Sequence, residues 1–149
     1  MAAKSGSNIQ FNYFKTTFRL PEPKKTAAWL DRVVKLERSS IGSLSYVFCT
    51  DSYLLGINKK YLAHDTLTDI ITFDYTEKPG SLEGEIYISV PRVKENAKKL
   101  GVDLDAELHR VIVHGVLHLV GYGDKGKEKI EMRKREDGYL ELRVSRGTG

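Results

Sequence analysis

The stretch that decides the fold runs from Asp103 to Gly121 and reads DLDAELHRVIVHGVLHLVG. Its apolar side chains recur at the spacing of a helix with a broad buried face. They are Leu108, Val111, Ile112, Val116, Leu117 and Leu119. Asp103 or Asp105 is suited to cap the first turn, and Gly121 is suited to end the last one. The stretch therefore predicts a central, buried helix.

Around this helix the chain alternates between strand-like and helix-like segments. The patterns predict strands over 9–14, 43–48, 69–75 and 85–90, and helices over 27–38, 51–62, 91–100 and 127–144. Because residues 77–81 form a turn between two adjacent strands, we expect a mixed sheet packed with helices, an α+β fold rather than a fully parallel sheet. We expect a single domain over 1–149, with residues 1–7 and 145–149 frayed.

Composition narrows the class of protein. Of the 149 residues, 24 are Lys or Arg and 20 are Asp or Glu, and the resulting charge of +4 is too small to identify a partner. Cys49 is the only cysteine, which excludes a disulfide framework and an all-thiolate zinc site and indicates a reducing compartment. The sequence contains no apolar run of the roughly 18 residues that a membrane span needs, and no signal peptide is evident. We therefore expect a soluble, cytoplasmic protein.

Two histidines of the central helix form a candidate metal site. His114 and His118 are four residues apart, so both imidazoles project from the same helix face. A hydrolytic zinc site needs three protein ligands and an open position for water. Asp124 follows Gly121, where the chain can turn back toward the same ion. The sequence predicts one zinc ion held by His114, His118 and Asp124; the alternative is a packed or surface pair of histidines without a metal.

Two other possible ligands are expected to have different roles. His109 is five residues before His114 and so lies on another helix face, where we expect a structural or surface role. Cys49 lies on a predicted strand, and we expect a small core residue there.

The spacing of the candidate ligands matches the metal motif of the metzincin proteases, with Asp124 in place of the third histidine. In those proteases a glutamate directly after the first histidine is the general base. Here that position is Gly115. The sequence therefore argues against a metal-dependent peptidase, which we keep as a minor alternative.

Residues 114–122 read His-Gly-Val-Leu-His-Leu-Val-Gly-Tyr, and three earlier stretches accompany them. These are Asn-Lys-Lys-Tyr at 58–61, Asp-Thr-Leu-Thr-Asp-Ile-Ile-Thr-Phe at 65–73 and Gly-Glu-Ile-Tyr-Ile-Ser at 84–89. In this order they resemble the motifs of the YbeY-type endoribonucleases, a family of rRNA maturation factors with the signature His-Gly-x-Leu-His-Leu-x-Gly-Tyr-Asp-His. The resemblance covers roughly residues 44–124.

The resemblance implies a small α+β fold whose central helix carries the first two metal ligands. It implies one Zn2+ ion and a single-strand-specific endoribonuclease that acts in ribosomal RNA maturation and ribosome quality control. The implied partners are ribosomal RNA and the ribosomal subunit, with no membrane partner. Carried onto this chain, the ligands are His114 and His118, with Asp124 in the place of the third histidine. His114 is also the candidate for a direct catalytic role.

The chain departs from the family pattern upstream of the histidines. Leu62 stands where the family has an arginine, and Leu67 stands where it has a proline. An arginine can donate two parallel hydrogen bonds to phosphate oxygens, which leucine cannot do. Lys59, Lys60 and His64 are the candidates for supplying RNA-binding charge instead; the alternative is a solvated face.

Two further expectations follow from these features. The charged segment 127–144 is expected to be a solvated helix with internal ion pairs, and a docking surface for ribosomal RNA or protein is the alternative. The loss of the family arginine and of the third histidine supports a second functional class. In that class the protein is a ribosome-assembly binding factor with a structural metal and little catalytic activity.

Overall fold

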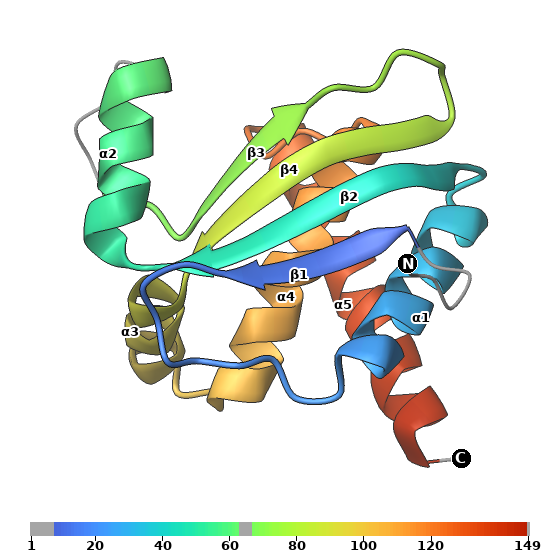
Figure 1. Ribbon diagram of the computed structural model, residues 1–149. Coiled ribbons are helices and arrows are strands. Elements are labelled where there is room, and N and C mark those ends of the chain that lie inside the picture. Colours follow the sequence, from blue (N-terminus) through green and yellow to red (C-terminus); the bar gives the residue numbers. More distant parts are fainter. Residues whose placement is uncertain (1–7, 63–66, 149) are drawn as a thin grey trace.

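A central helix and a four-stranded sheet organise the computed structural model, which describes residues 8–62 and 67–148 (Figure 1). The elements in chain order are β1 (Ile9–Tyr13), α1 (Pro23–Leu36), β2 (Ser40–Cys49), α2 (Asp51–Leu62), β3 (Ile70–Asp74), β4 (Ser81–Ser89), α3 (Val90–Leu100), α4 (Leu104–Val120) and α5 (Lys127–Thr148). Helices α1, α4 and α5 lie on one side of the sheet, and α2 stands at its end. Within the described residues, no helix combines the length and apolar character that crossing a membrane requires.

The sheet is mixed, with the strand order β1-β2-β4-β3. Strand β2 pairs in parallel with β1 and with β4, whereas β3 and β4 form an antiparallel pair in which Ile70 is opposite Ile88. The turn between β3 and β4 allows this antiparallel pairing without a crossover helix. The prediction of an α+β fold with a mixed sheet is therefore confirmed.

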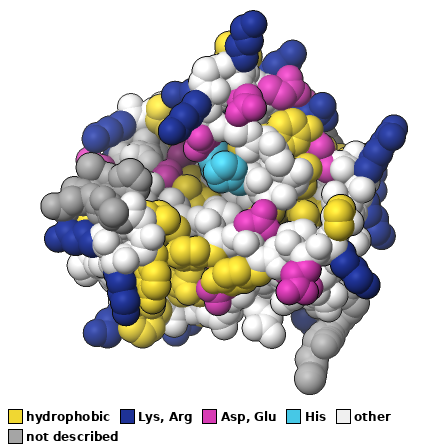
Figure 2. Space-filling view, turned by 90° about the horizontal axis from the view of Figure 1, so that it is seen from above, with side chains coloured by type: hydrophobic (Ala, Val, Ile, Leu, Met, Phe, Trp, Pro, Cys, Tyr) yellow, Lys and Arg dark blue, Asp and Glu magenta, His cyan; other side chains and the backbone are white. Residues whose placement is uncertain are grey.

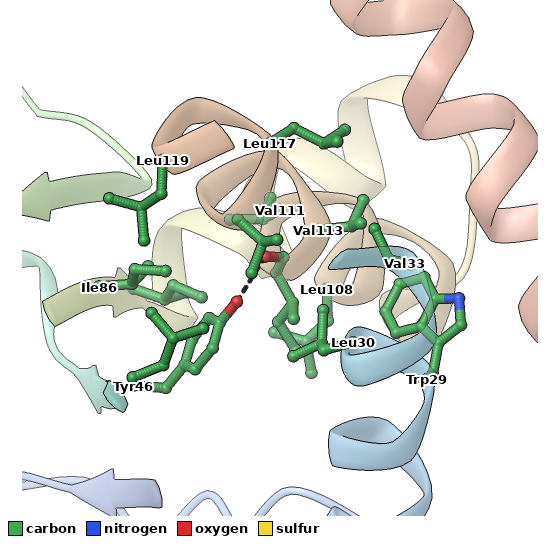
Figure 3. Close-up of a cluster of buried hydrophobic side chains, with 14 of the residues drawn as sticks. Trp29, Leu30, Val33, Tyr46, Ile86, Leu108, Val111, Val113, Leu117 and Leu119 are labelled. Atoms are coloured by element: carbon green, nitrogen blue, oxygen red, sulfur yellow. Dashed lines mark hydrogen bonds between the residues drawn. The ribbon is translucent and has the colours of Figure 1, made fainter. Parts of the chain in front are cut away.

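Helix α4 is the predicted central helix. Asp103 caps it, since its Oδ1 accepts a hydrogen bond of 2.8 Å from the backbone N–H of Ala106. Gly121, with φ of 131°, ends it as expected. The hydroxyl of Tyr46 on β2 donates to the carbonyl of Ile112 at 2.8 Å, and this bond joins α4 to the sheet within the apolar core (Figure 3). The apolar face of α4 is thus fixed on the sheet, and the opposite face is left for other contacts.

Helix α5 and the turn before it are held onto α1. The indole N–H of Trp29 donates to the carbonyl of Tyr139 at 2.9 Å. The Glu37 carboxylate, at the end of α1, accepts hydrogen bonds from the hydroxyls of Tyr122 and Tyr139. These contacts fix α5 beside α4, although the two helices are separated by a turn of six residues, 121–126.

Several element boundaries differ from the sequence-based prediction. Strands β2 and β4 begin earlier, at Ser40 and Ser81, because the two residues pair with each other and extend the ladder. The sequence favours Asp51 as the cap of α2, but Thr50 caps it, since its hydroxyl oxygen accepts from the N–H of Tyr53 at 3.2 Å. The Asp51 carboxylate bonds to Ser89 and Arg92. Helix α5 continues to Thr148, beyond the expected end near 144, since no proline interrupts its hydrogen-bond ladder. Residues 1–7 lie outside the described residues.

Candidate metal centre

The exposed face of α4 forms the floor of an open cleft. His114 and His118 lie on this floor with their ring centroids 5.8 Å apart. The end of α2, strand β3 and helix α5 supply the walls of the cleft, whose volume is about 1190 Å³. Figure 2 shows this side of the molecule, with a histidine near the centre, acidic side chains close to it and Lys and Arg side chains toward the edge. The predicted histidine pair is therefore accessible from solvent.

His114 is held by a buried carboxylate of α5. Its Nδ1 lies 2.6 Å from Oε2 of Glu136, a residue that is only 4 % exposed. The other oxygen of Glu136 accepts from Arg110 at 2.9 Å. Burial by itself lowers the pKa of His114, but the hydrogen bond and charge of Glu136, with the charges of Asp124 and Asp69, outweigh it and raise the pKa above its ordinary value. Glu136 thus fixes the ring and directs Nε2 away from α5.

His118 is oriented by the backbone instead of by a carboxylate. Its Nδ1 donates to the carbonyl oxygen of Tyr122 at 3.0 Å. This contact exists because Gly121 turns the chain back over the end of α4, where its φ of 131° strains any side chain. As at His114, the occupied Nδ1 leaves Nε2 as the nitrogen that can bind a metal.

Asp124 lies in the turn between α4 and α5 and lines the same cleft as the two histidines. Its charge is one of the influences that raise the pKa of His114. Over residues 8–62 and 67–148, however, no three His, Cys, Asp or Glu side chains stand close enough to form a complete metal site. The structure brings the three predicted ligands to one cleft, and two of them stand side by side.

The donor chemistry of this cleft suits a zinc ion. Two imidazoles that bind one ion at about 2.0–2.1 Å have ring centres roughly 5 Å apart, close to the separation of His114 and His118. Each ring has its Nδ1 on an oxygen acceptor, which is the usual support for a metal-binding histidine. The exposed carboxylate of Asp124 adds an oxygen donor of a type that zinc accepts.

The carboxylates of Asp69 and Glu107 also line the cleft. Burial raises the pKa of both, although the side chain of Asn96 donates to Asp69 at 3.3 Å and the positive charges of Arg110 and Arg133 favour the ionised form of Glu107. The floor of the cleft is therefore acidic around His114, which favours a cation there.

His109 and Gly115 have core positions, which explains why neither contributes to the cleft. His109 is 1 % exposed, and its two ring nitrogens bond to Thr26 and to the carbonyl of Asp105. A Cβ at Gly115 would lie 3.0 Å from two side-chain atoms of Ile86. A glutamate at this position would therefore point into the helix–sheet contact, so the general base of the metzincin pattern has no place here. Cys49 is fully buried, as expected of a core residue.

Of the three residues predicted to bind RNA, the structure describes two, and it does not bring these two to the cleft. Among the described residues, Lys59 and Lys60 of α2 do not line it, whereas their neighbour Leu62 does. The ammonium group of Lys60 lies 5.3 Å from the ring centroid of Tyr61. His64 lies outside the described residues.

Seven charged residues of the cleft were not among the predicted site residues. They are Asp69, Glu107, Arg110, Lys129, Arg133, Lys134 and Glu136. Four of them belong to α5, which the sequence pattern had assigned to a solvated face. Lys129 and Arg133 share a helix face through their spacing of four, and this was the available signal. The contact between Glu136 and His114 spans 22 residues, and no local pattern reveals it.

The fold and the site define an α+β protein with a histidine-based candidate metal centre on its central helix. The family described as Endoribonuclease YbeY matches residues 11–143. The chain belongs to this family, as the sequence motifs predicted.

Known relatives agree with this assignment. A protein of Cytophaga hutchinsonii named Endoribonuclease YbeY is 48 % identical over 134 residues, which cover 88 % of this chain and 94 % of the relative. A protein of the same name from Amoebophilus asiaticus is 45 % identical over 135 residues, with 90 % and 92 % covered. A solution structure of a Thermotoga maritima protein has a TM-score of 0.67 at 25 % identity and covers 94 % of this chain and 91 % of its own.

Proposed function

We propose that this protein is a zinc-dependent, single-strand-specific endoribonuclease that acts in ribosomal RNA maturation and ribosome quality control in the cytoplasm. Its relatives are named endoribonucleases, and they match nearly the whole chain. The observation that carries the proposal is the paired orientation of His114 and His118 in an open cleft. Both rings use Nδ1 for a hydrogen bond, and neither Nε2 has a hydrogen-bond partner among the described residues.

His114, His118 and Asp124 are the residues that would hold the ion. When bound, zinc supplies Lewis-acid polarisation of a phosphate oxygen and acidifies water. Because Asp124 is exposed in the turn 121–126, its side chain has the freedom to approach the two imidazoles. Its negative charge offsets part of the charge of the ion, which a third imidazole would not do.

The chain's own residues hold the site in place. Glu136 accepts from both Arg110 and His114, so one buried carboxylate fixes an imidazole and a guanidinium together. The side chain of Leu62 lines the opposite wall, at the end of α2. RNA phosphates must therefore be held by cations from elsewhere in the cleft, since leucine makes no hydrogen bond.

A ribosome-assembly factor with a structural metal is the second candidate. Two observations favour it: Leu62 lines the cleft where the family has an arginine, and no complete three-ligand group is formed within the described residues. The two candidates differ in whether the protein cuts RNA, because a structural ion supports folding without turnover.

The test is cleavage of a single-stranded ribosomal RNA fragment by protein purified from a host that lacks the major ribonucleases. We expect the wild-type protein to cut it, a chelator to stop the reaction and added zinc to restore it. The double variant His114→Ala/His118→Ala purified in parallel should be inactive. Equal cleavage by wild type and double variant would assign the activity to a contaminant and leave the binding-factor candidate in place.

A further inference from the structure

One wall of the cleft carries three cations from a single helix. Lys129, Arg133 and Lys134 of α5 all line the cleft that holds His114 and His118. We call these three residues the α5 basic wall. None of their side chains has a hydrogen bond or an ion pair to another residue in the part of the chain that the structure describes.

Two other arginines near the cleft are already paired with carboxylates of the protein. Arg110 donates to Glu136 and to Asp137, at 2.9 and 2.7 Å. Arg135 bonds to Glu131 and Glu37 and lies over the ring of Tyr122. Since these guanidinium groups are neutralised within the protein, the α5 basic wall holds the positive charge that remains for a ligand.

Charge is segregated within the cleft. The acidic side chains of the cleft come from several elements and are Asp69, Glu107, Asp124 and Glu136, of which Glu136 contacts His114, whereas the three cations of the α5 basic wall all come from one helix. Ile130 projects from the same wall and is 66 % exposed. An anionic chain with apolar faces between its charges fits this pattern, because phosphates contact the cations and an unstacked base covers the isoleucine.

We propose that the α5 basic wall binds the phosphates of a single-stranded RNA and guides the strand across the histidine pair. This inference rests on the proposed function, since RNA is the polyanion that an endoribonuclease must hold. It gives α5 a substrate-binding role, whereas its sequence pattern favoured a solvated surface and left a docking surface for RNA or protein as the alternative. It also supplies the positive charge that Leu62 cannot provide on the opposite wall.

The experiment compares two triple variants with the same change in net charge. The wall variant carries Lys129→Gln, Arg133→Gln and Lys134→Gln. The control variant carries Lys94→Gln, Lys98→Gln and Lys99→Gln on α3, which are exposed and lie outside the cleft. Binding of a fluorescently labelled single-stranded oligouridylate is measured by anisotropy at several salt concentrations, with the RNA checked for integrity after each titration.

We expect the wall variant to lose RNA affinity by about 100-fold at 0.1 M salt, because each phosphate contact to a single strand contributes about 0.7 to the salt exponent. The slope of log K against log salt concentration should become shallower by about 2 for the three contacts. The control variant should bind within about twofold of wild type, because its lysines reach no strand in the cleft. Circular dichroism confirms that both variants are folded.

Three results would overturn the inference: a wall variant that binds like wild type, a control variant that loses as much affinity as the wall variant, or a wild-type protein that does not bind the oligonucleotide. Failure of the proposed function is seen separately. If the wall variant loses binding while no form of the protein cuts RNA, the wall is an RNA-binding surface on a binding factor.

Discussion

The two ends of helix α4 place the same side chain in opposite environments. Near its N-terminal end, His109 is 1 % exposed, packs beside Trp29 and has both ring nitrogens bonded within the protein. Near its C-terminal end, His114 and His118 each have one nitrogen bonded and face the cleft. A single helix thus holds one histidine that stabilises the fold and two that can bind a ligand.

The difference lies in what the second nitrogen meets. At His109, Thr26 supplies a hydroxyl for Nε2, and burial lowers the pKa of the ring so that the neutral form is favoured. At the other end, α5 and the turn 121–126 supply partners for Nδ1, and no residue that the structure describes bonds to Nε2. A histidine is therefore a candidate ligand when its neighbours orient the ring and leave one nitrogen open, and not because of its spacing alone.

The largest effect is expected at the turn beyond the C-terminal end. Asp124→Ala removes the third candidate ligand and should lower zinc affinity by more than about 100-fold, the upper range for loss of a supporting group. Asp124→His supplies an imidazole at the same place and should keep most of the affinity. Competition with a chromogenic chelator measures both. Unchanged affinity in Asp124→Ala would show that another group completes the site.

The next largest effect is expected at the buried histidine near the N-terminal end of α4, where stability should change and zinc affinity should not. His109→Ala leaves the Thr26 hydroxyl and the Asp105 carbonyl without their partner and opens a void beside Trp29. We expect the free energy of unfolding to fall by about 2 kcal/mol while zinc affinity is retained. Urea titration of the zinc-free protein measures the first quantity, with His118→Ala as the exposed control, which should change stability by less than about 0.5 kcal/mol. Equal losses in the two variants would erase the distinction between the two ends.

The sequence alone predicts the local features of this arrangement but not its long-range contacts. The pattern of residues 103–121 was sufficient to predict α4 and its end and to narrow its cap to Asp103 or Asp105, because helix periodicity and capping are local. The histidine pair followed from the same periodicity. The role of Glu136 did not, since its contact with His114 depends on how α5 lies on α4 and α1, and long-range contacts such as those of Trp29 and Glu37 hold α5 there.

Helix α5 shows a second limit of prediction from the sequence alone. Lys129 and Arg133 look like ordinary members of a solvated helix, because their sequence neighbours include acidic residues at helical spacing. Only the three-dimensional structure shows that these two side chains point toward the cleft, whereas Arg135 is used by Glu131 and Glu37. Charge in the sequence therefore could not separate cations available for RNA from those already paired.

A smaller effect is expected when the hydrogen bond that orients His114 is weakened. Glu136→Gln keeps the size of the side chain but removes its charge, and its amide cannot accept from Arg110 and His114 equally well. Zinc affinity should fall by about tenfold. The matched control is Asp137→Asn, because Asp137 also accepts from Arg110 at 2.7 Å but does not contact His114. Nitrogen-15 NMR of the zinc-free protein reports the proton on Nδ1 of His114 directly; identical spectra and affinities for Glu136→Gln and wild type would contradict the role of Glu136.

The smallest effect is a difference in the pH dependence of stability. Because burial lowers the pKa of His109 while Asp105 raises it and Arg143 lowers it, the folded protein favours the neutral ring. The stabilisation is complete above the unfolded pKa of about 6.5 and is lost as the pH falls through the lower folded value. Wild type should therefore lose stability on acidification more steeply than His109→Gln, by at most about 1.4 kcal/mol per pH unit. Parallel stability curves between pH 7 and 5, measured by urea titration, would contradict this.

The most direct test of the account is the metal content of three purified proteins: wild type, His109→Ala and His114→Ala/His118→Ala. Inductively coupled plasma mass spectrometry after loading with zinc and desalting gives the ion-to-chain ratio. We expect a ratio close to one for wild type and for His109→Ala, and a ratio close to zero for the double variant. A double variant that retains a full zinc ion would show that the cleft at the C-terminal end of α4 is not the metal centre.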